Sequence, residues 1–236
     1  MTENSQNSIF DAYDSESPTA IELRRIYNNL RRYCTRDNNT FLITSSNRGE
    51  GKSTIAAYLA LTIARIRKKK VLLIDADIRR PTLHKIFDLN REFGLTDCLE
   101  NSEDPIKLIK TTRQENLFVI TAGERSESPS NLFETDIISN ILKKVKFYYD
   151  MVLIDSSPVL AVSDTLFLAG EANKIVFVIL AGVTPREVVV RARDLIRETN
   201  AEIIGAVVNN AMEVLPYYYD YKYYSKESSL ETKDTK

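Results

Sequence analysis

The chain has 236 residues, of which 43% are hydrophobic and 28% charged, a composition that suits one folded domain with flexible ends. Its 32 basic and 33 acidic residues leave a net charge of −1, which argues against a general nucleic-acid-binding protein. Cys34 and Cys98 lack the spacing of metal ligands, and a single histidine excludes a histidine cluster. With no signal peptide and no apolar run near the ~20 residues of a membrane span, we expect a soluble cytoplasmic protein that reaches a membrane only through a partner.

The sequence divides into an arm, a domain and a tail. Residues 1–18 are polar and end at a proline, and we expect them to form a flexible arm. The folded domain is predicted over residues 19–213, with an N-terminal helix within residues 19–38. The end of the chain is rich in tyrosine and then in polar and charged residues, so residues 214–236 are predicted to be a mobile tail.

Short apolar runs alternate with helical patterns along the domain. The first run, Phe41–Thr44, precedes a polar glycine loop and a helical pattern from Ile55 to Ile66. The second, Val71–Ile74, ends in carboxylates, as buried parallel strands do where they meet an active site. Four more strands are predicted at Leu117–Ile120, Met151–Ile154, Lys174–Leu180 and Ile203–Val208. This alternation predicts an α/β fold with a mostly parallel sheet, helices on both faces and ligands at the carboxyl ends of the strands.

The segment Thr184-Pro185-Arg186-Glu187 carries a helix-start signal. It has the spacing of a capping box, with proline at the first helical position. We therefore expect a helix that begins here and runs to about Thr199.

A phosphate-binding loop is predicted between the first strand and the helix that follows it. Residues 46–54 read Ser-Asn-Arg-Gly-Glu-Gly-Lys-Ser-Thr; the glycines let N–H groups turn onto phosphate oxygens, and the helix start adds its positive dipole end. Lys52 can reach the β- and γ-phosphates, and the Ser53 hydroxyl can bind Mg²⁺. Ser46 stands where the usual pattern has a glycine, so the match is incomplete. The predicted nucleotide contacts are Arg48, Gly49, Glu50, Gly51, Lys52, Ser53 and Thr54.

Acidic residues follow two of the predicted strands. The second strand continues into Asp75-Ala76-Asp77-Ile78-Arg79, and the strand at Met151–Ile154 continues into Asp155. Asp75 and Asp77 are two positions apart, so they point to the same side if the strand geometry continues. Mg²⁺ binds through one or two carboxylates and substrate phosphates. Three carboxylates at strand ends beside a phosphate loop suit that role better than three caps of ordinary loops.

A run of tyrosines lies near the end of the chain. Tyrosine occupies six of the eight positions from 217 to 224, and neither a strand nor a helix period explains the run. Beside a site for ATP phosphates, a dense set of phosphate-accepting hydroxyls suggests self-modification. The predicted phosphoacceptors are Tyr217, Tyr218, Tyr219, Tyr221, Tyr223 and Tyr224.

Together these motifs resemble the bacterial tyrosine autokinases (BY-kinases), specifically the cytoplasmic type that works with a separate membrane activator. The resemblance rests on GEGKST at 49–54, VLLIDADIRRP at 71–81, VLIDSSP at 152–158 and the tyrosine run. It implies a P-loop NTPase fold, ATP and Mg²⁺ as cofactors, phosphorylation of the chain's own tail and a role in capsular or exopolysaccharide synthesis. The implied partners are a transmembrane activator of polysaccharide chain length, further copies of the chain and a tyrosine phosphatase.

The candidate site residues receive roles from the needs of phosphoryl transfer. Lys52 and the loop amides are predicted to hold the phosphates, while Ser53, Asp77 and Asp155 hold Mg²⁺. A carboxylate near the acceptor can take its proton as the new bond forms. We assign that role to Asp75, with the alternative that Asp75 and Asp77 exchange roles.

Four residues qualify this picture. Arg79 either stabilises phosphate charge or pairs with an acid. Asn209 contacts adenine, by resemblance to related ATPases, or is an asparagine satisfied within its own loop. Arg48 replaces a proline that often precedes GEGK in the family. Asn28 replaces the last arginine of a Glu-x-x-Arg-x-x-Arg assembly motif, which weakens the expectation of ring-like oligomers.

The position of the tyrosines predicts phosphorylation between subunits. A flexible tail of this length spans roughly 25 Å, but the tyrosines begin only a few residues after the last strand. A neighbouring subunit's site is therefore the better target. Each phosphate adds a charge of about −1.5 to −2, so modified tails should repel the acidic site and loosen the assembly.

Two other functions are compatible with a phosphate-binding loop in this chain. A partition or cell-division ATPase, working as a nucleotide switch without kinase activity, is the main alternative; Asn47 at the position of its signature lysine argues against it. The other is a nucleotide-binding adaptor that never transfers phosphate.

The basic run Arg65–Lys70 lies at the end of a predicted helix, where cations interact favourably with the helix dipole. Contact of this run with anionic lipid or an acidic partner is the alternative.

Overall fold

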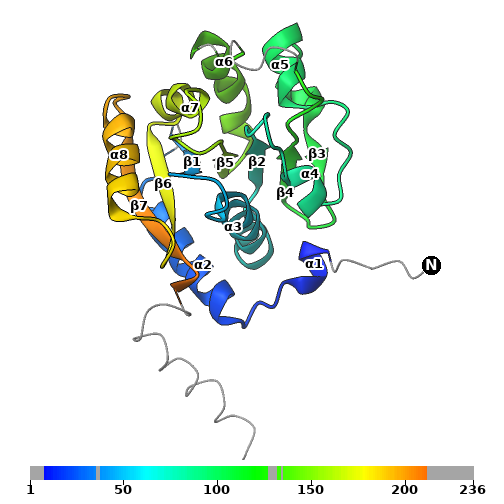
Figure 1. The fold of residues 1–236 in the computed structure, drawn as a ribbon. Helices are drawn as coiled ribbons and strands as arrows, with labels where there is room; N and C mark the ends of the chain where they lie inside the picture. Colours follow the sequence, from blue (N-terminus) through cyan, green and yellow to red (C-terminus); the bar gives the residue numbers. More distant parts are fainter. Residues whose placement is uncertain (1–7, 36–37, 127–131, 134, 212–236) are drawn as a thin grey trace, which may run out of the picture.

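A seven-stranded sheet runs through the middle of the domain (Figure 1). The computed structural model describes residues 8–35, 38–126, 132–133 and 135–211. The strand order is β3-β4-β2-β5-β1-β6-β7, and all pairs are parallel except β3 with β4. The predicted mostly parallel α/β fold is confirmed, and only the two-residue β3 was not expected. The strands are β1 (Thr40–Ser45), β2 (Val71–Asp75), β3 (Lys110–Thr111), β4 (Leu117–Ile120), β5 (Met151–Asp155), β6 (Lys174–Leu180) and β7 (Glu202–Asn209).

Helices cover both faces of the sheet, with α2 and α3 on one side and α6 and α7 on the other (Figure 1). None of the helices in the described part of the chain is long and apolar enough to cross a membrane. The α-helices are α1 (Ile9–Ala12), α2 (Pro18–Leu30), α3 (Lys52–Arg67), α4 (Leu83–Ile86), α5 (Leu95–Asn101), α6 (Thr135–Val145), α7 (Asp164–Ala172) and α8 (Arg186–Arg197). Two short 3₁₀ turns are η1 (Pro105–Leu108) and η3 (Lys146–Tyr148).

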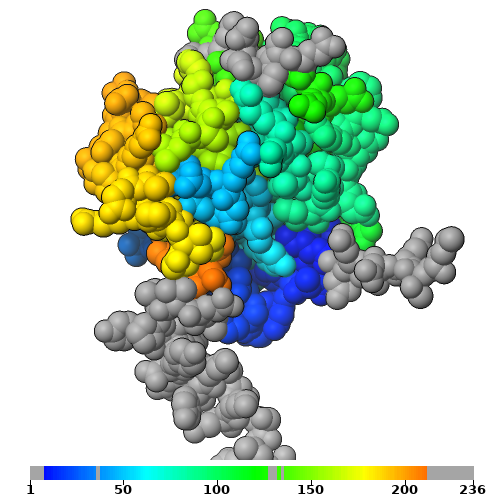
Figure 2. Space-filling model, in the orientation of Figure 1, coloured from blue at the N-terminus to red at the C-terminus, as the bar shows by residue number. Residues whose placement is uncertain are grey.

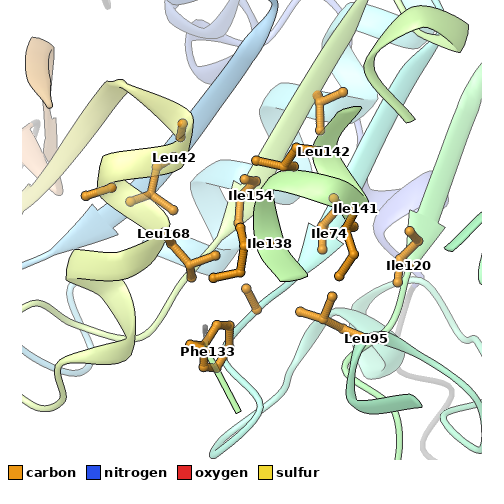
Figure 3. Packing of buried hydrophobic residues seen from close by; sticks show 14 of the residues in the cluster. Leu42, Ile74, Leu95, Ile120, Phe133, Ile138, Ile141, Leu142, Ile154 and Leu168 are labelled. Atoms are coloured by element: carbon orange, nitrogen blue, oxygen red, sulfur yellow. The ribbon is translucent and has the colours of Figure 1, made fainter. Parts of the chain in front are cut away.

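The two helix layers enclose two hydrophobic cores, one on each face of the sheet. Side chains alternate along a strand, so Phe41 and Ile43 of β1 enter the core under α2 and α3, whereas Leu42 enters the opposite core. Figure 3 shows this opposite core, where Leu42 and Ile154 from the sheet meet Ile138 of α6. Each fully buried aliphatic side chain of this kind stabilises the fold by about 1.5–3 kcal/mol. The cores fix the central strands, and these strands fix the loops at their carboxyl ends.

The segment before α2 differs from the flexible arm expected over residues 1–18. From residue 8 onward it packs against α3: Ile9 and Tyr13 are buried, and the Tyr13 hydroxyl donates to Thr62 Oγ1 at 2.9 Å. The Tyr13 ring also stacks on Tyr58. Burial of the Ile9 and Tyr13 side chains orders this segment, although most of its other residues are polar. Helix α2 then begins at Pro18, capped by the Ser17 hydroxyl.

The start of α8 also differs from the prediction. The helix begins at Arg186 with Pro185 at the capping position, and no side chain caps it. The Thr184 hydroxyl, expected to cap, instead donates to the buried carboxylate of Glu50 in the phosphate loop. The competing carboxylate comes from a distant part of the chain, so local spacing could not reveal it.

Candidate active site

The loop between β1 and α3 has the backbone shape of a phosphate cradle. Gly49 and Gly51 both adopt left-handed φ angles, of 80° and 89°. A Cβ atom at Gly51 would lie 2.2 Å from Asn209 Nδ2, so the left-handed φ favours glycine here and any larger residue would also displace the Asn209 amide. The loop runs directly into the N-terminus of α3, where free N–H groups and the helix dipole favour an anion.

A cavity of about 530 Å³ opens over this loop. Figure 2 shows the light-blue loop at the centre of the visible face, with the yellow-green segment between β5 and α7 above it. All predicted loop residues except Glu50 line the cavity. The other lining residues are Asp77, Arg79, Arg80, Thr82, Ile86, Ser157, Pro158, Ala161 and Val162.

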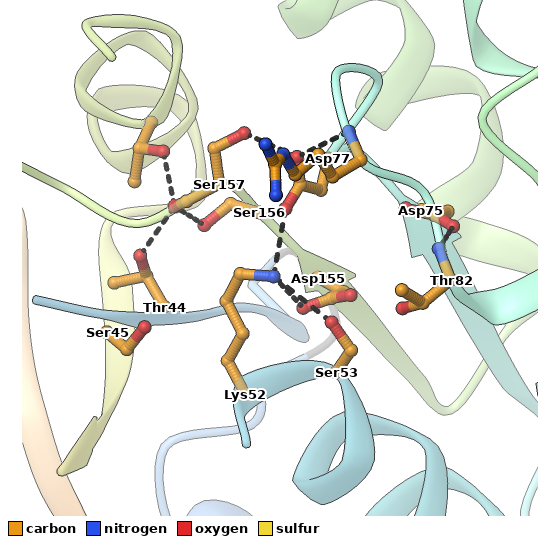
Figure 4. Close-up of polar contacts among 12 residues, drawn as sticks. Thr44, Ser45, Lys52, Ser53, Asp75, Asp77, Thr82, Asp155, Ser156 and Ser157 are labelled. Carbon is orange, nitrogen blue, oxygen red and sulfur yellow. Dashed lines mark hydrogen bonds and ion pairs between the residues drawn. The ribbon is translucent and has the colours of Figure 1, made fainter. Parts of the chain in front are cut away.

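Lys52 lies among the carboxylates at the ends of β2 and β5 (Figure 4). Its ammonium is 3.0 Å from Asp77 Oδ2, 3.7 Å from Asp155 Oδ1 and 3.1 Å from the Ser53 hydroxyl. Burial opposes its charge, but the Asp155 and Asp77 carboxylates outweigh that effect and raise the pKa of Lys52. The lysine therefore carries a firm positive charge at the cavity, as a phosphate-binding lysine must.

Asp155 is fully buried, with the Lys52 ammonium 3.7 Å from its Oδ1 and the Ser53 hydroxyl nearby, but among the described residues no hydrogen bond of good geometry reaches either oxygen. Burial raises the pKa of Asp155 to about 6, against the opposing effect of the Lys52 ammonium. A buried carboxylate is costly unless its charge is compensated, and at 3.7 Å the Lys52 ammonium compensates it only in part. This pair of unsatisfied oxygens, next to the Ser53 hydroxyl and Asp77, fits the hard-oxygen donor set of Mg²⁺.

The donor set is incomplete without phosphate. In the described ranges no cluster of three or more His, Cys, Asp or Glu side chains is arranged to hold a metal. Mg²⁺ usually binds through one or two carboxylates plus substrate phosphates and water. The residues that fit, Ser53, Asp77 and Asp155, are those predicted from the sequence, and the remaining ligands would come from ATP.

Asp77 is fixed by three contacts that point its carboxylate into the cavity, two of them in addition to Lys52. Besides Lys52, its Oδ1 accepts from the Ser157 hydroxyl at 2.8 Å and from the Arg80 N–H at 3.2 Å. Ser157 was not identified in the sequence, although it lies in the VLIDSSP motif. Its hydroxyl orients the carboxylate that Lys52 and a cation share.

Asp75 and Asp77 do not point to the same side, contrary to the expectation from their spacing. Strand β2 ends at Asp75, so the alternation of a strand does not continue to Asp77. The Asp75 carboxylate turns toward α4 and accepts from the N–H groups of Thr82 and Leu83 at 3.2 and 3.0 Å. It is fully buried beside Asp155 in the register of β2 and β5. Burial, reinforced by the charge of Asp155, raises the pKa of Asp75 to about 8.

The remaining predicted contacts are divided between cavity and protein. Arg79 lines the cavity, and its Nε donates to the buried Asp164 carboxylate at 3.0 Å, so it does pair with an acid. Asn209 Nδ2 donates to the Glu50 carbonyl at 3.0 Å, which satisfies it within the protein. Arg48 is exposed at the cavity rim.

Glu50 does not face the cavity, although it was predicted to contact the nucleotide. Its side chain is buried beneath the loop. One carboxylate oxygen accepts from the Asn47 N–H at 2.8 Å, and the other accepts from the Thr184 hydroxyl. Glu50 therefore braces the loop against the segment before α8. The predicted phosphoacceptor tyrosines, at 217–224, lie outside the described residues.

Comparison with known proteins gives a consistent result. Residues 39–185 match the family described as an AAA domain. The chain is 31% identical over 226 residues to tyrosine-protein kinase YwqD of Bacillus subtilis, covering 95% of this chain and 94% of that one. It is 35% identical over 184 residues to the putative tyrosine-protein kinase CapB of Staphylococcus aureus, covering 77% of this chain and 80% of CapB.

Two solved structures resemble this chain to different degrees, a kinase domain at higher sequence identity and an ATPase at lower identity. The kinase domain of the Escherichia coli tyrosine kinase ETK superimposes with a TM-score of 0.78 at 29% identity, covering 88% of this chain and 82% of that domain. The cell-division ATPase MinD of Pyrococcus furiosus superimposes with a TM-score of 0.65 at 19% identity. At that identity the second likeness shows only the fold, which is that of a P-loop ATPase.

Proposed function

Because the chain belongs to the bacterial tyrosine autokinases, we propose that it transfers the γ-phosphoryl group of ATP to the tyrosines at 217–224. The observation that carries this proposal is the position of Lys52. Its ammonium stands over a glycine-shaped phosphate loop, between Asp77 and a buried Asp155 with unsatisfied oxygens. Binding of a triphosphate with Mg²⁺ requires a positive charge for the phosphates and a carboxylate for the cation, and Lys52 and Asp155 provide these two groups next to each other.

In this mechanism the loop and Lys52 bind and orient the phosphates. N–H groups at the start of α3 donate hydrogen bonds to the phosphate oxygens, and Lys52 exchanges its carboxylate partners for the β- and γ-phosphates. Ser53, Asp77 and Asp155 would hold Mg²⁺, which neutralises phosphate charge when bound. Arg79, fixed by Asp164, lies at the same cavity and can meet charge on the transferred group.

The acceptor tyrosine must lose its proton during transfer, because its hydroxyl has an ordinary pKa near ~10. A carboxylate that faces the cavity is the suitable acceptor. The geometry supports only half of the exchanged assignment: Asp77 faces the cavity and would meet the acceptor as well as the cation, whereas Asp75 does not line the cavity. Asp75, which is buried and bonded to α4, would act from behind by holding the end of β2 in place.

We further propose that the tail enters the site of a neighbouring copy. The tyrosines follow the last described residue, Ala211, by only a few positions, and this short spacing supports transfer between subunits. Several phosphates on one tail would repel the acidic site and release the tail. A membrane activator and a tyrosine phosphatase would then set the balance that controls capsular or exopolysaccharide synthesis, with the kinase held at the inner face of the membrane.

A phosphotyrosine blot tests the central proposal. Purified protein incubated with ATP and Mg²⁺ should gain phosphotyrosine, and Lys52→Met should not. The reaction should be repeated with a cytoplasmic segment of a membrane activator, because the proposed mode of control includes such a partner. Phosphate release without any phosphotyrosine under both conditions would instead support the ATPase switch.

A further inference from the structure

Basic and aromatic side chains lie together at the end of the sheet where the parallel strands begin, opposite the active site. Because β1, β2, β5 and β6 are parallel, the segments that precede them lie at one end of the sheet, and the segments that follow β1, β2 and β5 form the active site at the other end. We call the surface at the first end the strand-start face. It is defined by Arg32, Tyr33, Lys68, Lys70, Phe147 and Tyr148.

Hydrogen bonds join the segments of the strand-start face into one surface. The Lys70 N–H donates to the Asp150 carboxylate at 2.8 Å, which links the end of α3 to η3. The Asn39 amide donates to the Tyr149 carbonyl at 2.7 Å, which links the start of β1 to the same turn. The Tyr33 carbonyl accepts from the side chain of the first residue of β6. The face therefore extends across the starts of four strands.

Aromatic side chains protrude from this surface. Phe147 and Tyr148 are 61% and 66% exposed, and Tyr33 is 38% exposed. Two adjacent rings with most of their area in water are unusual in a soluble domain and mark an interaction site. The two tyrosine rings also favour the boundary between water and lipid headgroups, where an apolar body and a polar tip are both accommodated, and Phe147 adds apolar area beside them.

Exposed cations lie on the same face, where one acidic side chain, Asp150, pairs with Lys69 at 3.0 Å. Arg32, Lys68 and Lys70 are all exposed, and they come from the ends of two different helices. The dipole of α3 accounts for cations in its last turn, such as Arg67. It does not account for Lys70, which lies beyond the helix, or for the rings of η3. With a net charge of only −1 over the chain, this positive face is a local feature.

We infer that the strand-start face binds an anionic membrane surface, with Phe147 and Tyr148 at headgroup depth and the three cations on lipid phosphates. Cations that precede two strands of the sheet, β1 and β2, match an extended surface of negative charge better than they match one acidic peptide. In this orientation the ATP cavity, at the other end of the strands, faces away from the bilayer. Nucleotide and acceptor tails then reach it freely. The inference is independent of the proposed kinase reaction.

Vesicle sedimentation tests it on the full-length chain. The protein should bind vesicles of equimolar phosphatidylcholine and phosphatidylglycerol, and should bind phosphatidylcholine vesicles much more weakly. Lys68→Gln with Lys70→Gln should weaken binding about 25-fold, because each cation near the surface contributes about fivefold. Phe147→Ser with Tyr148→Ser should weaken it about tenfold or more. The matched control is Arg186→Gln with Arg191→Gln on α8, which removes the same charge and should change binding less than twofold.

Each outcome decides the matter. All variants should keep wild-type autophosphorylation in solution, since none touches the site, and this reports that they fold. Equal binding to the two vesicle types would overturn the inference, and so would equal losses in the test and control pairs. If the lysine pair changes the size of the assembly in solution while vesicle binding stays intact, the face is an interface between copies and the inference is wrong.

Discussion

The Lys52 ammonium and the Asp77 carboxylate lie 3.0 Å apart, although 25 positions separate them in the sequence. Their side chains are only 12% and 8% exposed, so water screens the pair far less than it screens a surface ion pair. Phosphate oxygens that enter the cavity compete with Asp77 for the lysine. Binding of the nucleotide thus frees the carboxylate for a cation at the moment when the cation arrives with the phosphates.

Asp77→Asn should separate phosphate binding from transfer. The amide keeps the shape of the side chain and can still accept from Ser157, but it neither charges the cavity nor supports a cation. We expect phosphotyrosine formation to fall by about 10²-fold or more, with ATP binding in the absence of Mg²⁺ little changed. Asp88→Asn, at a carboxylate that is 76% exposed and paired with Arg113, is the control. Equal rates for the two variants would remove Asp77 from the mechanism.

Asp155→Asn should make the nucleotide-free protein more stable while it abolishes activity. The substitution removes a fully buried charge whose burial cost exceeds the compensation from the Lys52 ammonium 3.7 Å away, and Lys52 keeps Asp77 as its ion-pair partner. We expect the free energy of unfolding to rise by about 1–3 kcal/mol, and each kcal/mol should raise the Tm by about 2–4 °C. The further rise that ATP and Mg²⁺ give the wild type should disappear. A lower Tm for the variant without nucleotide would show that the carboxylate supports the fold.

The nucleotide-free protein should lose stability as the pH rises. Burial raises the pKa of Asp75 to about 8 and that of Asp155 to about 6, from an ordinary value of 3.8. A carboxyl group with a raised folded-state pKa holds its proton more tightly when folded. Its contribution to stability is therefore complete below pH 3.8 and is lost as the pH passes through its folded-state value.

Urea unfolding at a series of pH values measures this effect. Between the ordinary pKa and about pH 8, these two groups should lower the free energy of unfolding steadily. Asp75→Asn keeps an oxygen for the Thr82 and Leu83 N–H groups, so it should fold and should flatten the upper part of the curve. If Asp75→Asn and the wild type show the same slope of unfolding free energy against pH, between the pKa of about 6 for Asp155 and that of about 8 for Asp75, the prediction is wrong.

The sequence predicted the sheet and the phosphate loop because their signals are local. Val71–Ile74 and Lys174–Leu180 are apolar runs of strand length, and the observed strands match them within one residue. The orientations of Glu50 and Thr184 were not predicted because these residues are partners from distant parts of the chain, and that of Asp75 was not predicted because β2 ends there. Asp75 turns to α4, and Glu50 meets Thr184 across 134 positions. Spacing identifies residue types, whereas orientation comes from packing.

Gly51→Ala should damage nucleotide binding more than Gly49→Ala. Both positions have left-handed φ angles, which cost an alanine about 1 kcal/mol. A Cβ atom at Gly49 meets nothing within 4 Å, whereas one at Gly51 meets Asn209 Nδ2 at 2.2 Å. We therefore expect Gly51→Ala to weaken ATP binding strongly and Gly49→Ala to weaken it slightly.

The double variant Gly51→Ala with Asn209→Ala isolates the steric part of this effect. Removal of the Asn209 amide relieves the contact but leaves the backbone strain, so ATP affinity should return most of the way to that of Asn209→Ala alone. Titration with a fluorescent ATP analogue measures all four proteins. If the double variant binds as weakly as Gly51→Ala, the close approach of Asn209 is not the reason for glycine at this position.

Phosphorylation between subunits can be tested by mixing two inactive halves. A Lys52→Met chain keeps its tail but cannot use ATP, and an intact site on a chain that lacks residues 214–236 has no acceptor of its own. Neither alone should give phosphotyrosine, and the mixture should give it on the Lys52→Met chain, at a rate that rises with the concentration of the other chain. The matched control replaces the six tail tyrosines of the Lys52→Met chain with phenylalanine, which should remove the signal. If the wild type is labelled while the mixture stays unlabelled, the tail reaches its own site, and the short spacing after β7 is no barrier to that reach.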